Sequence, residues 1–178
     1  NGVRTLENFV EQYPNSAHYT QALSDLGLAY MNLGQKDKAL MYYDMVVKAA
    51  PKSSASKGAL RGIREIYVDS GDADSYFEYA EKVGVEVDVN VATRDSLSYA
   101  AAQKLYLDNK TKEATTSFNA YLKNYPNGHY QNDALFFYRV GRPDIVQVQV
   151  MAQVLGEDGA VEGADLPDVQ GGGLFQKG

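Results

Sequence analysis

Three prolines divide the chain at nearly regular intervals. Pro14 and Pro51 are 37 residues apart, and Pro126 follows Pro51 by 75 residues, which is close to twice that spacing. Residues of matching chemistry also recur 75 positions apart: Gly27 and Ala102, Gly34 and Asn109, Ala39 and Ala114, Tyr43 and Phe118. A fixed period of this length is typical of repeat proteins, in which each unit packs mainly on its neighbours.

Each unit has the pattern of two short helices. In the first half, apolar residues spaced by 3, 4 and 3 positions lie on one helical face: Leu23, Leu26, Tyr30 and Leu33. Gly34 then favours the left-handed conformation that ends a helix, and Asn109 is the next-best residue at the equivalent place. Asp37 can begin a second helix, which Pro51 ends because proline cannot continue the hydrogen-bonded ladder.

Small residues recur where the two helices of a unit would cross. Gly27 and Ala39 are 12 residues apart across the predicted turn, as are Ala102 and Ala114. Small side chains at both places let two antiparallel helices approach closely. Tyr43, or Phe118 in the later unit, would fill the space beside them.

The first unit resembles the tetratricopeptide repeat. The string Leu26-Gly27-x-x-Tyr30-x-x-x-Gly34-x-x-x-x-Ala39-x-x-x-Tyr43, with Pro51 eight residues on, is similar to the family signature, with Leu23 in place of its tryptophan. The third unit has the expected residues except for Leu105 at the aromatic position. The middle unit keeps Ile63, Tyr67 and Gly71 but has Tyr76 and Asp88 where alanine and proline are expected. The resemblance implies an all-α solenoid, a right-handed superhelix of antiparallel helix pairs.

The repeat pattern predicts the organisation of the chain. Residues 1–140 would form the array, with the second helix of a repeat at 1–13, whose first helix lies upstream, and the first helix of a further repeat at 130–138. Complete repeats are expected at about 20–53, 57–84 and 95–128.

Two segments depart from the helical pattern. Val85–Val91 alternates apolar and polar residues and is expected to be extended, either as a loop whose valines pack on the flanking helices or as an exposed edge that pairs with a partner. Residues 141–178 are expected to be a non-repeat extension, with a possible strand at 145–150 and a tail rich in Gly and acidic residues.

Most chemical functions find no support in the sequence. The net charge of −6 does not favour a nucleic-acid binder, cysteine is absent, and no apolar run reaches the roughly 18 residues that span a bilayer. His18 and His129 are expected in inter-repeat turns, Ser54–Lys57 in a solvated turn with capping serines, and Asp72 and Asp74 at a helix start. We therefore expect no enzyme activity, cofactor, metal, nucleic acid or direct membrane insertion.

The resemblance also implies a binding face. In the family, the second, fifth, ninth and twelfth places of a unit point into the concave groove. Nine of these residues are the predicted partner-binding set, and some of them are equally compatible with packing on a neighbouring repeat: Gln21, Ser24, Leu28, Met31, Arg61, Glu65, Tyr99, Gln103 and Tyr106. Gly58, Val68 and Ser96 fill the remaining places. Because Arg61 is the only basic residue among the twelve, the family's Lys/Arg/Asn clamp for a terminal carboxylate is not expected.

The sequence thus predicts a non-catalytic scaffold that binds a peptide or partner protein and that belongs to a longer chain with further repeats. Two alternatives stay open: a structural spacer in a larger repeat protein, and an accessory region of an enzyme whose catalytic domain lies elsewhere. The form Phe9-x-x-x-Tyr13-Pro14-Asn15-Ser16 is similar to repeats of bacterial cell-envelope proteins. That similarity predicts a periplasmic or envelope location, with the cytoplasm as the alternative.

Overall fold

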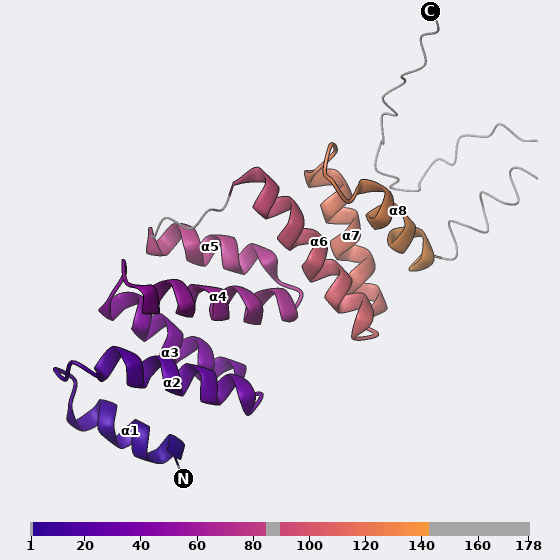
Figure 1. Cartoon of the computed structure of the whole chain (residues 1–178). Helices are drawn as coiled ribbons and strands as arrows, with labels where there is room; N and C mark the ends of the chain where they lie inside the picture. The colour runs from indigo at the N-terminus through magenta and orange to yellow at the C-terminus, as the bar shows by residue number, and fades with distance from the viewer. Residues whose placement is uncertain (1, 85–89, 143–178) are drawn as a thin grey trace, which may run out of the picture. The chain divides into compact units, whose positions relative to one another are not determined.

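The computed structural model describes residues 2–84 and 90–142, and their regular secondary structure is entirely α-helical (Figure 1). The eight helices are α1 (Gly2–Gln12), α2 (Tyr19–Asn32), α3 (Lys36–Ala49), α4 (Ser54–Asp69), α5 (Ala73–Val83), α6 (Val91–Leu107), α7 (Thr111–Asn124) and α8 (Gln131–Val140). The prediction of an all-α helical-repeat fold is confirmed.

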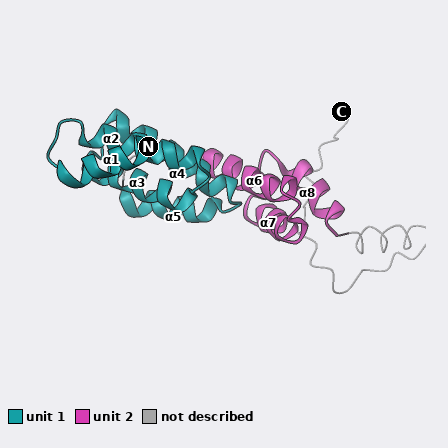
Figure 2. Ribbon diagram, turned by 90° about the horizontal axis from the view of Figure 1, so that it is seen from below, with its two compact units in different colours: residues 1–90 teal, residues 91–178 magenta. Residues whose placement is uncertain are grey.

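The helices pack in sequential order within two compact units. Unit 1 comprises residues 1–90 and unit 2 residues 91–178 (Figure 2). In unit 1, α1 packs on α2, α2 on α3, α3 on α4 and α4 on α5, and α2 also contacts α4. In unit 2, α7 packs on both α6 and α8. We call α2, α4, α6 and α8 first-type helices because they hold the predicted first-helix positions, and α1, α3, α5 and α7 second-type helices.

The turn that follows a first-type helix has the same geometry three times. Gly34, Gly71 and Asn109 have φ values of 71°, 76° and 60°, as their residue types predict. In each turn the next amide bonds a carbonyl five residues back, in the manner of a Schellman motif: Gln35 to Tyr30, Asp72 to Tyr67 and Lys110 to Leu105, each at 2.9 Å. Asn109 is the only non-glycine among the described residues with a positive φ.

Two helix starts are fixed by side chains. The Asp72 carboxylate accepts a hydrogen bond from the amide of Ser75 at 3.1 Å and caps α5, as predicted. Ser53 caps α4 by accepting from the amide of Ser56 at 3.0 Å. The prediction of a solvated turn at Ser54–Lys57 is therefore wrong, because these residues form the first turn of α4 and Ser56 is fully buried.

One aromatic ring holds three helices of unit 1 together. Tyr43 of α3 is 7% exposed and lies between glycines of the two flanking first-type helices. A Cβ atom on Gly27 of α2 would come within 2.4 Å of one edge of the ring, and a Cβ on Gly62 of α4 within 2.5 Å of the opposite edge. Only glycine leaves room for the ring at both places, so the two residues set how closely α2 and α4 approach α3.

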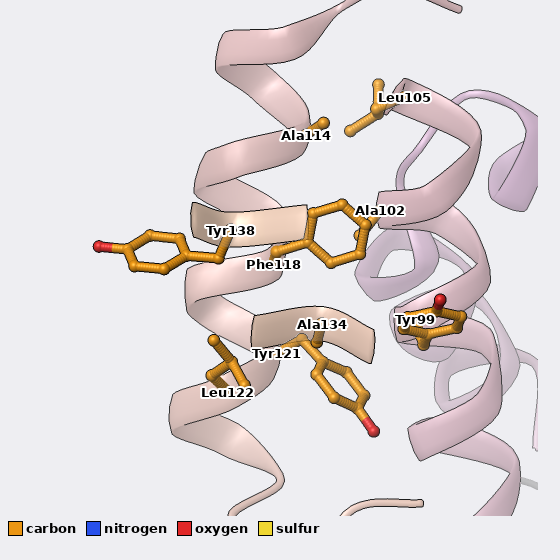
Figure 3. Close-up of a cluster of buried hydrophobic side chains, with 9 residues drawn as sticks. All are labelled: Tyr99, Ala102, Leu105, Ala114, Phe118, Tyr121, Leu122, Ala134 and Tyr138. Atoms are coloured by element: carbon orange, nitrogen blue, oxygen red, sulfur yellow. The ribbon is translucent and has the colours of Figure 1, made fainter. Parts of the chain in front are cut away.

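The core of unit 2 is built from rings and alanines on α6, α7 and α8. Figure 3 shows the Phe118 ring extending from α7 toward Ala102 of α6, and both residues are fully buried. A buried carboxylate, Asp95 of α6, accepts hydrogen bonds from the Tyr121 hydroxyl and, at 2.7 Å, from the amide of His129. These bonds join α7 and the turn that follows it to α6.

Parts of the predicted non-helical segments lie outside the described residues. This holds for residues 85–89 of the alternating stretch and for the possible strand at 145–150 and the Gly/acid-rich tail. Val91, however, is the first residue of α6 and is 78% exposed, so the prediction that it continues an extended stretch is wrong. The Val91 side chain is exposed to solvent, so the packing on flanking helices that the alternating pattern suggested does not hold it in an extended conformation.

The contact between Tyr43 and Gly27 gives a test of the core of unit 1. We expect Gly27→Ala to lower the free energy of unfolding by about 1–3 kcal/mol, because the new methyl group overlaps the ring. Gly58→Ala in α4 is the matched control: nothing lies within 4 Å of its Cβ, so it should be neutral or stabilise by up to about 1 kcal/mol. Urea unfolding curves that place both variants at the same stability would contradict this description.

Candidate protein-binding surfaces

The predicted binding face of α2 offers one large apolar side chain to solvent. Leu28 is 56% exposed, while Met31 is half-buried. The polar residues beside them are held locally, since the Gln21 side-chain amide donates to Asp25 at 2.9 Å and the Ser24 hydroxyl donates to the Thr20 carbonyl oxygen at 3.0 Å. An extended partner segment could therefore contact Leu28 without displacing any core residue.

The equivalent face of α4 is polar. Arg61 and Glu65 are both exposed, and the remaining two predicted positions, Gly58 and Val68, are half-buried. This surface supplies charges of both signs but little apolar area. In unit 1, the predicted face thus has one exposed aliphatic side chain on α2 and two charged side chains of opposite sign on α4.

Tyr99 of α6 belongs to the core of unit 2. It is 8% exposed, its ring stacks on Tyr130 with 4.4 Å between centroids, and it contacts Phe118 at 5.9 Å. For Tyr99 the packing alternative therefore explains the residue, and little of its ring is available to a partner. Gln103 and Tyr106, on the same helix, are half-buried, and Ser96 is exposed.

An aromatic strip crosses from α6 to α8. The ring centroids of Tyr106 and Phe137 are 4.8 Å apart, and those of Phe137 and Phe136 are 5.4 Å apart. Phe136 is 61% exposed and Val140, one turn further along α8, is 45% exposed. We call Tyr106, Phe136, Phe137 and Val140 the aromatic strip. An exposed phenylalanine beside an exposed valine is an apolar patch of the kind that marks interaction sites.

The sequence contains a signal for the part of this strip that the prediction missed. Phe136 and Val140 lie 10 and 14 residues after Pro126, just as Ser24 and Leu28 lie 10 and 14 residues after Pro14. Counted from residue 132, which corresponds to residue 20 of the first repeat, they therefore hold the fifth and ninth places of the partial repeat that contains α8. The predicted binding set ended with the third repeat and did not include them.

Two carboxylate–tyrosine sets, which sequence reasoning also missed, join successive helix pairs in unit 1. Glu7 of α1 accepts hydrogen bonds from the hydroxyls of Tyr30 and, at 3.3 Å, Tyr42. Displaced by 37 residues, Asp44 of α3 accepts from the hydroxyl of Tyr79 at 3.1 Å, and Tyr67 holds the place of Tyr30. An acidic residue followed by tyrosines 23 and 35 positions later is the sequence signal for both sets.

The buried setting disfavours ionisation of these phenols. Burial, reinforced by the charge of Glu7, raises the pKa of Tyr42 to about 12. The hydrogen bond to Glu7 is the main reason that the pKa of Tyr30 is raised, and burial is the main reason for Tyr79. The tyrosines are therefore neutral hydrogen-bond donors at physiological pH and serve to join helices.

Two hollows flank these sets. The first, of about 640 Å³, lies among α1, the end of α2 and the start of α3, and we call it the N-terminal hollow. The second, of about 680 Å³, lies among α3, α4 and α5 and is lined by residues that include Met41, Asp44 and Tyr79. Both are open to solvent and are not enclosed cavities.

The two histidines of the chain lie in turns between helices, and the described residues form no cluster that could bind a metal ion. His18 and His129 lie in the turns before α2 and α8, as predicted, and His129 uses its backbone amide to bond Asp95. Within 2–84 and 90–142, no three His, Asp or Glu side chains come together in a way that could hold a metal ion. No helix in these ranges is long and apolar enough to cross a bilayer.

The raised pKa of Tyr42 predicts a loss of stability at high pH. Since the pKa in the folded chain is above the value of about 10 in the unfolded chain, the neutral phenol stabilises the fold fully below pH 10. That contribution is lost as the pH rises through about 12. We expect urea midpoints to fall over this interval, and to fall less in Tyr42→Phe, which has no phenol to ionise. Tyr13→Phe, at a ring that is 56% exposed, should behave like the wild type; identical pH profiles for wild type and Tyr42→Phe would refute the assignment.

Comparison with known proteins identifies one repeat directly. The family model described as Tetratricopeptide repeat matches residues 21–53. The search of curated proteins and the search of solved structures each gave no match to this chain. The matched residues contain nearly all of α2, the turn at Gly34 and all of α3, which is one complete helix pair with the proline that follows it. Residues 21–53 of this chain are a tetratricopeptide repeat.

Proposed function

We propose that this chain is a non-catalytic scaffold that binds a segment of a partner protein on the exposed face of its first-type helices. A tetratricopeptide repeat implies a protein-interaction scaffold in general. The finer assignment is that Leu28 makes contacts in unit 1 and the aromatic strip makes contacts in unit 2. It is supported by the exposure of Leu28, Phe136 and Val140 and by the equivalent places that these three residues hold in the repeat.

The aromatic strip is the observation that carries the proposal. Burying a phenylalanine ring stabilises a complex strongly at a low cost in side-chain entropy, and aromatic residues are enriched at the centres of interfaces. The Phe136 ring contacts the ring of Phe137, which in turn contacts that of Tyr106, so a partner would meet rings that are already packed together. A spacer that only joined other domains would not need such a surface.

The compartment and the parent chain remain predictions. An envelope location rests on the resemblance of Phe9–Ser16 alone, and further repeats in the same parent chain are expected from the pattern of α1, which matches a second-type helix. The division of residues 1–140 into further repeats, other than the matched repeat at 21–53, also stays a prediction.

Display of random peptides against the purified chain tests the binding surface. We expect selected peptides to be rich in aromatic and aliphatic residues. Phe136→Ser combined with Val140→Ser should weaken their binding at least about tenfold, because both side chains are exposed and removing them leaves the core intact.

Val91→Ser is the matched control in the same unit, since this side chain is 78% exposed but lies outside the strip. Its affinity should stay within about twofold of the wild type. Peptides that bind the double variant as well as the wild type would remove the strip from the binding surface. A selection that yields no peptide above background would favour the spacer alternative.

A further inference from the structure

The N-terminal hollow is lined by none of the residues assigned to the binding surface above, and it has an apolar wall. Val3 of α1 and Leu33 at the end of α2 line it together with the ring of Tyr30. Leu33 is 58% exposed, which is high for a large aliphatic side chain in a folded unit. The hollow can therefore accept an apolar side chain that would cover Leu33.

The polar rim of the same hollow is positively charged. Arg4 and Lys38 line it and are exposed, and Glu7 is its only acidic residue. The Glu7 carboxylate already accepts hydrogen bonds from Tyr30 and Tyr42. The Lys38 Nζ lies 3.5 Å from the hydroxyl of Tyr30, which itself donates to Glu7, and 4.7 Å from the centroid of the Tyr30 ring. Among residues 2–84 and 90–142, neither Arg4 nor Lys38 forms an ion pair with a carboxylate.

This charge is of opposite sign to that of the chain as a whole, which has a net charge of −6. Two cations beside an apolar wall complement a segment in which an apolar side chain is flanked by carboxylates. A basic segment would meet Arg4 and Lys38 as like charges, and a purely apolar one would leave them unpaired at the edge of the contact.

We propose that the N-terminal hollow is a second docking site, which binds an acidic segment of a partner protein that also carries apolar side chains. An apolar side chain of the segment packs on Leu33, Val3 and the Tyr30 ring. The neighbouring carboxylates pair with Arg4 and Lys38. The site lies entirely within unit 1 and uses none of the residues of the aromatic strip.

A labelled peptide with alternating Leu and Asp, capped at both ends, is the probe, and its binding to the full chain is followed by fluorescence anisotropy. We expect saturable binding that weakens as salt is added. Arg4→Gln combined with Lys38→Gln should raise the Kd at least about tenfold. Lys52→Gln combined with Lys57→Gln removes the same charge from exposed positions elsewhere in unit 1 and should leave the Kd within about twofold.

Two further measurements separate binding from folding and from general charge. Arg4→Lys combined with Lys38→Arg keeps both charges and should retain most of the affinity. If the double-Gln variant instead lost affinity because packing at Tyr30 was disturbed, this charge-preserving variant should lose affinity as well. A peptide with Lys in place of Asp, and one with Ser in place of Leu, should each bind at least about tenfold more weakly. The same peptide with an uncapped C-terminal carboxylate should bind no more than about twofold better than the capped peptide if side-chain carboxylates are the recognised groups.

The proposal is overturned if the acidic peptide does not bind, if the basic peptide binds equally well, or if both double-Gln variants lose affinity alike. It is also overturned if the chain self-associates through an interface that Leu33→Ser abolishes, since a second copy would then be the occupant. Phe136→Ser combined with Val140→Ser should leave this binding unchanged, so failure here is distinguishable from failure of the aromatic strip.

Discussion

The close approach of three helices around Tyr43 is the constraint on which unit 1 depends. Opposite edges of the Tyr43 ring pack against Gly27 and Gly62, and a Cβ atom on either glycine would overlap the ring. Because Gly27 and Gly62 lie on successive first-type helices, the ring fixes both the pairing of α2 with α3 and the packing of α3 on α4. In repeat proteins such nearest-neighbour contacts supply most of the stability.

The carboxylate–tyrosine sets add polar contacts between helices of unit 1 that the Tyr43 ring does not join. Glu7 and Asp44 sit on second-type helices, and the tyrosines they bond sit on the next helix pair. A buried phenol needs a hydrogen-bond partner, so each set favours one register between neighbouring pairs. The apolar core and these bonds fix the register between helices. The outward-facing side chains of the first-type helices are therefore not needed to hold the helices together. Leu28 and Phe136 occupy such positions, and both are exposed.

The local features of the fold could be predicted from the sequence because they depend on residues close together in the chain. Helical spacing, the left-handed turns at Gly34 and Asn109, and the Asp72 cap all follow from short-range stereochemistry. The role of Tyr99 could not be predicted in the same way. Its position in the repeat suggested a binding face, but the ring of Tyr130, which lies 31 residues later in the turn before α8, stacks on it. Asp95 was missed for a related reason, since its partners Tyr121 and His129 come together only in the folded unit.

The measurement that bears most directly on this account is the solution NMR spectrum of the Tyr43 ring. The ring lies within contact distance of both glycines, so its protons should show nuclear Overhauser contacts to the α-protons of Gly27 and of Gly62 in the same molecule. Contacts to both would establish that one ring joins two successive first-type helices. Contacts to one glycine alone, or to neither, would contradict the packing from which the repeat architecture and its binding surfaces are derived.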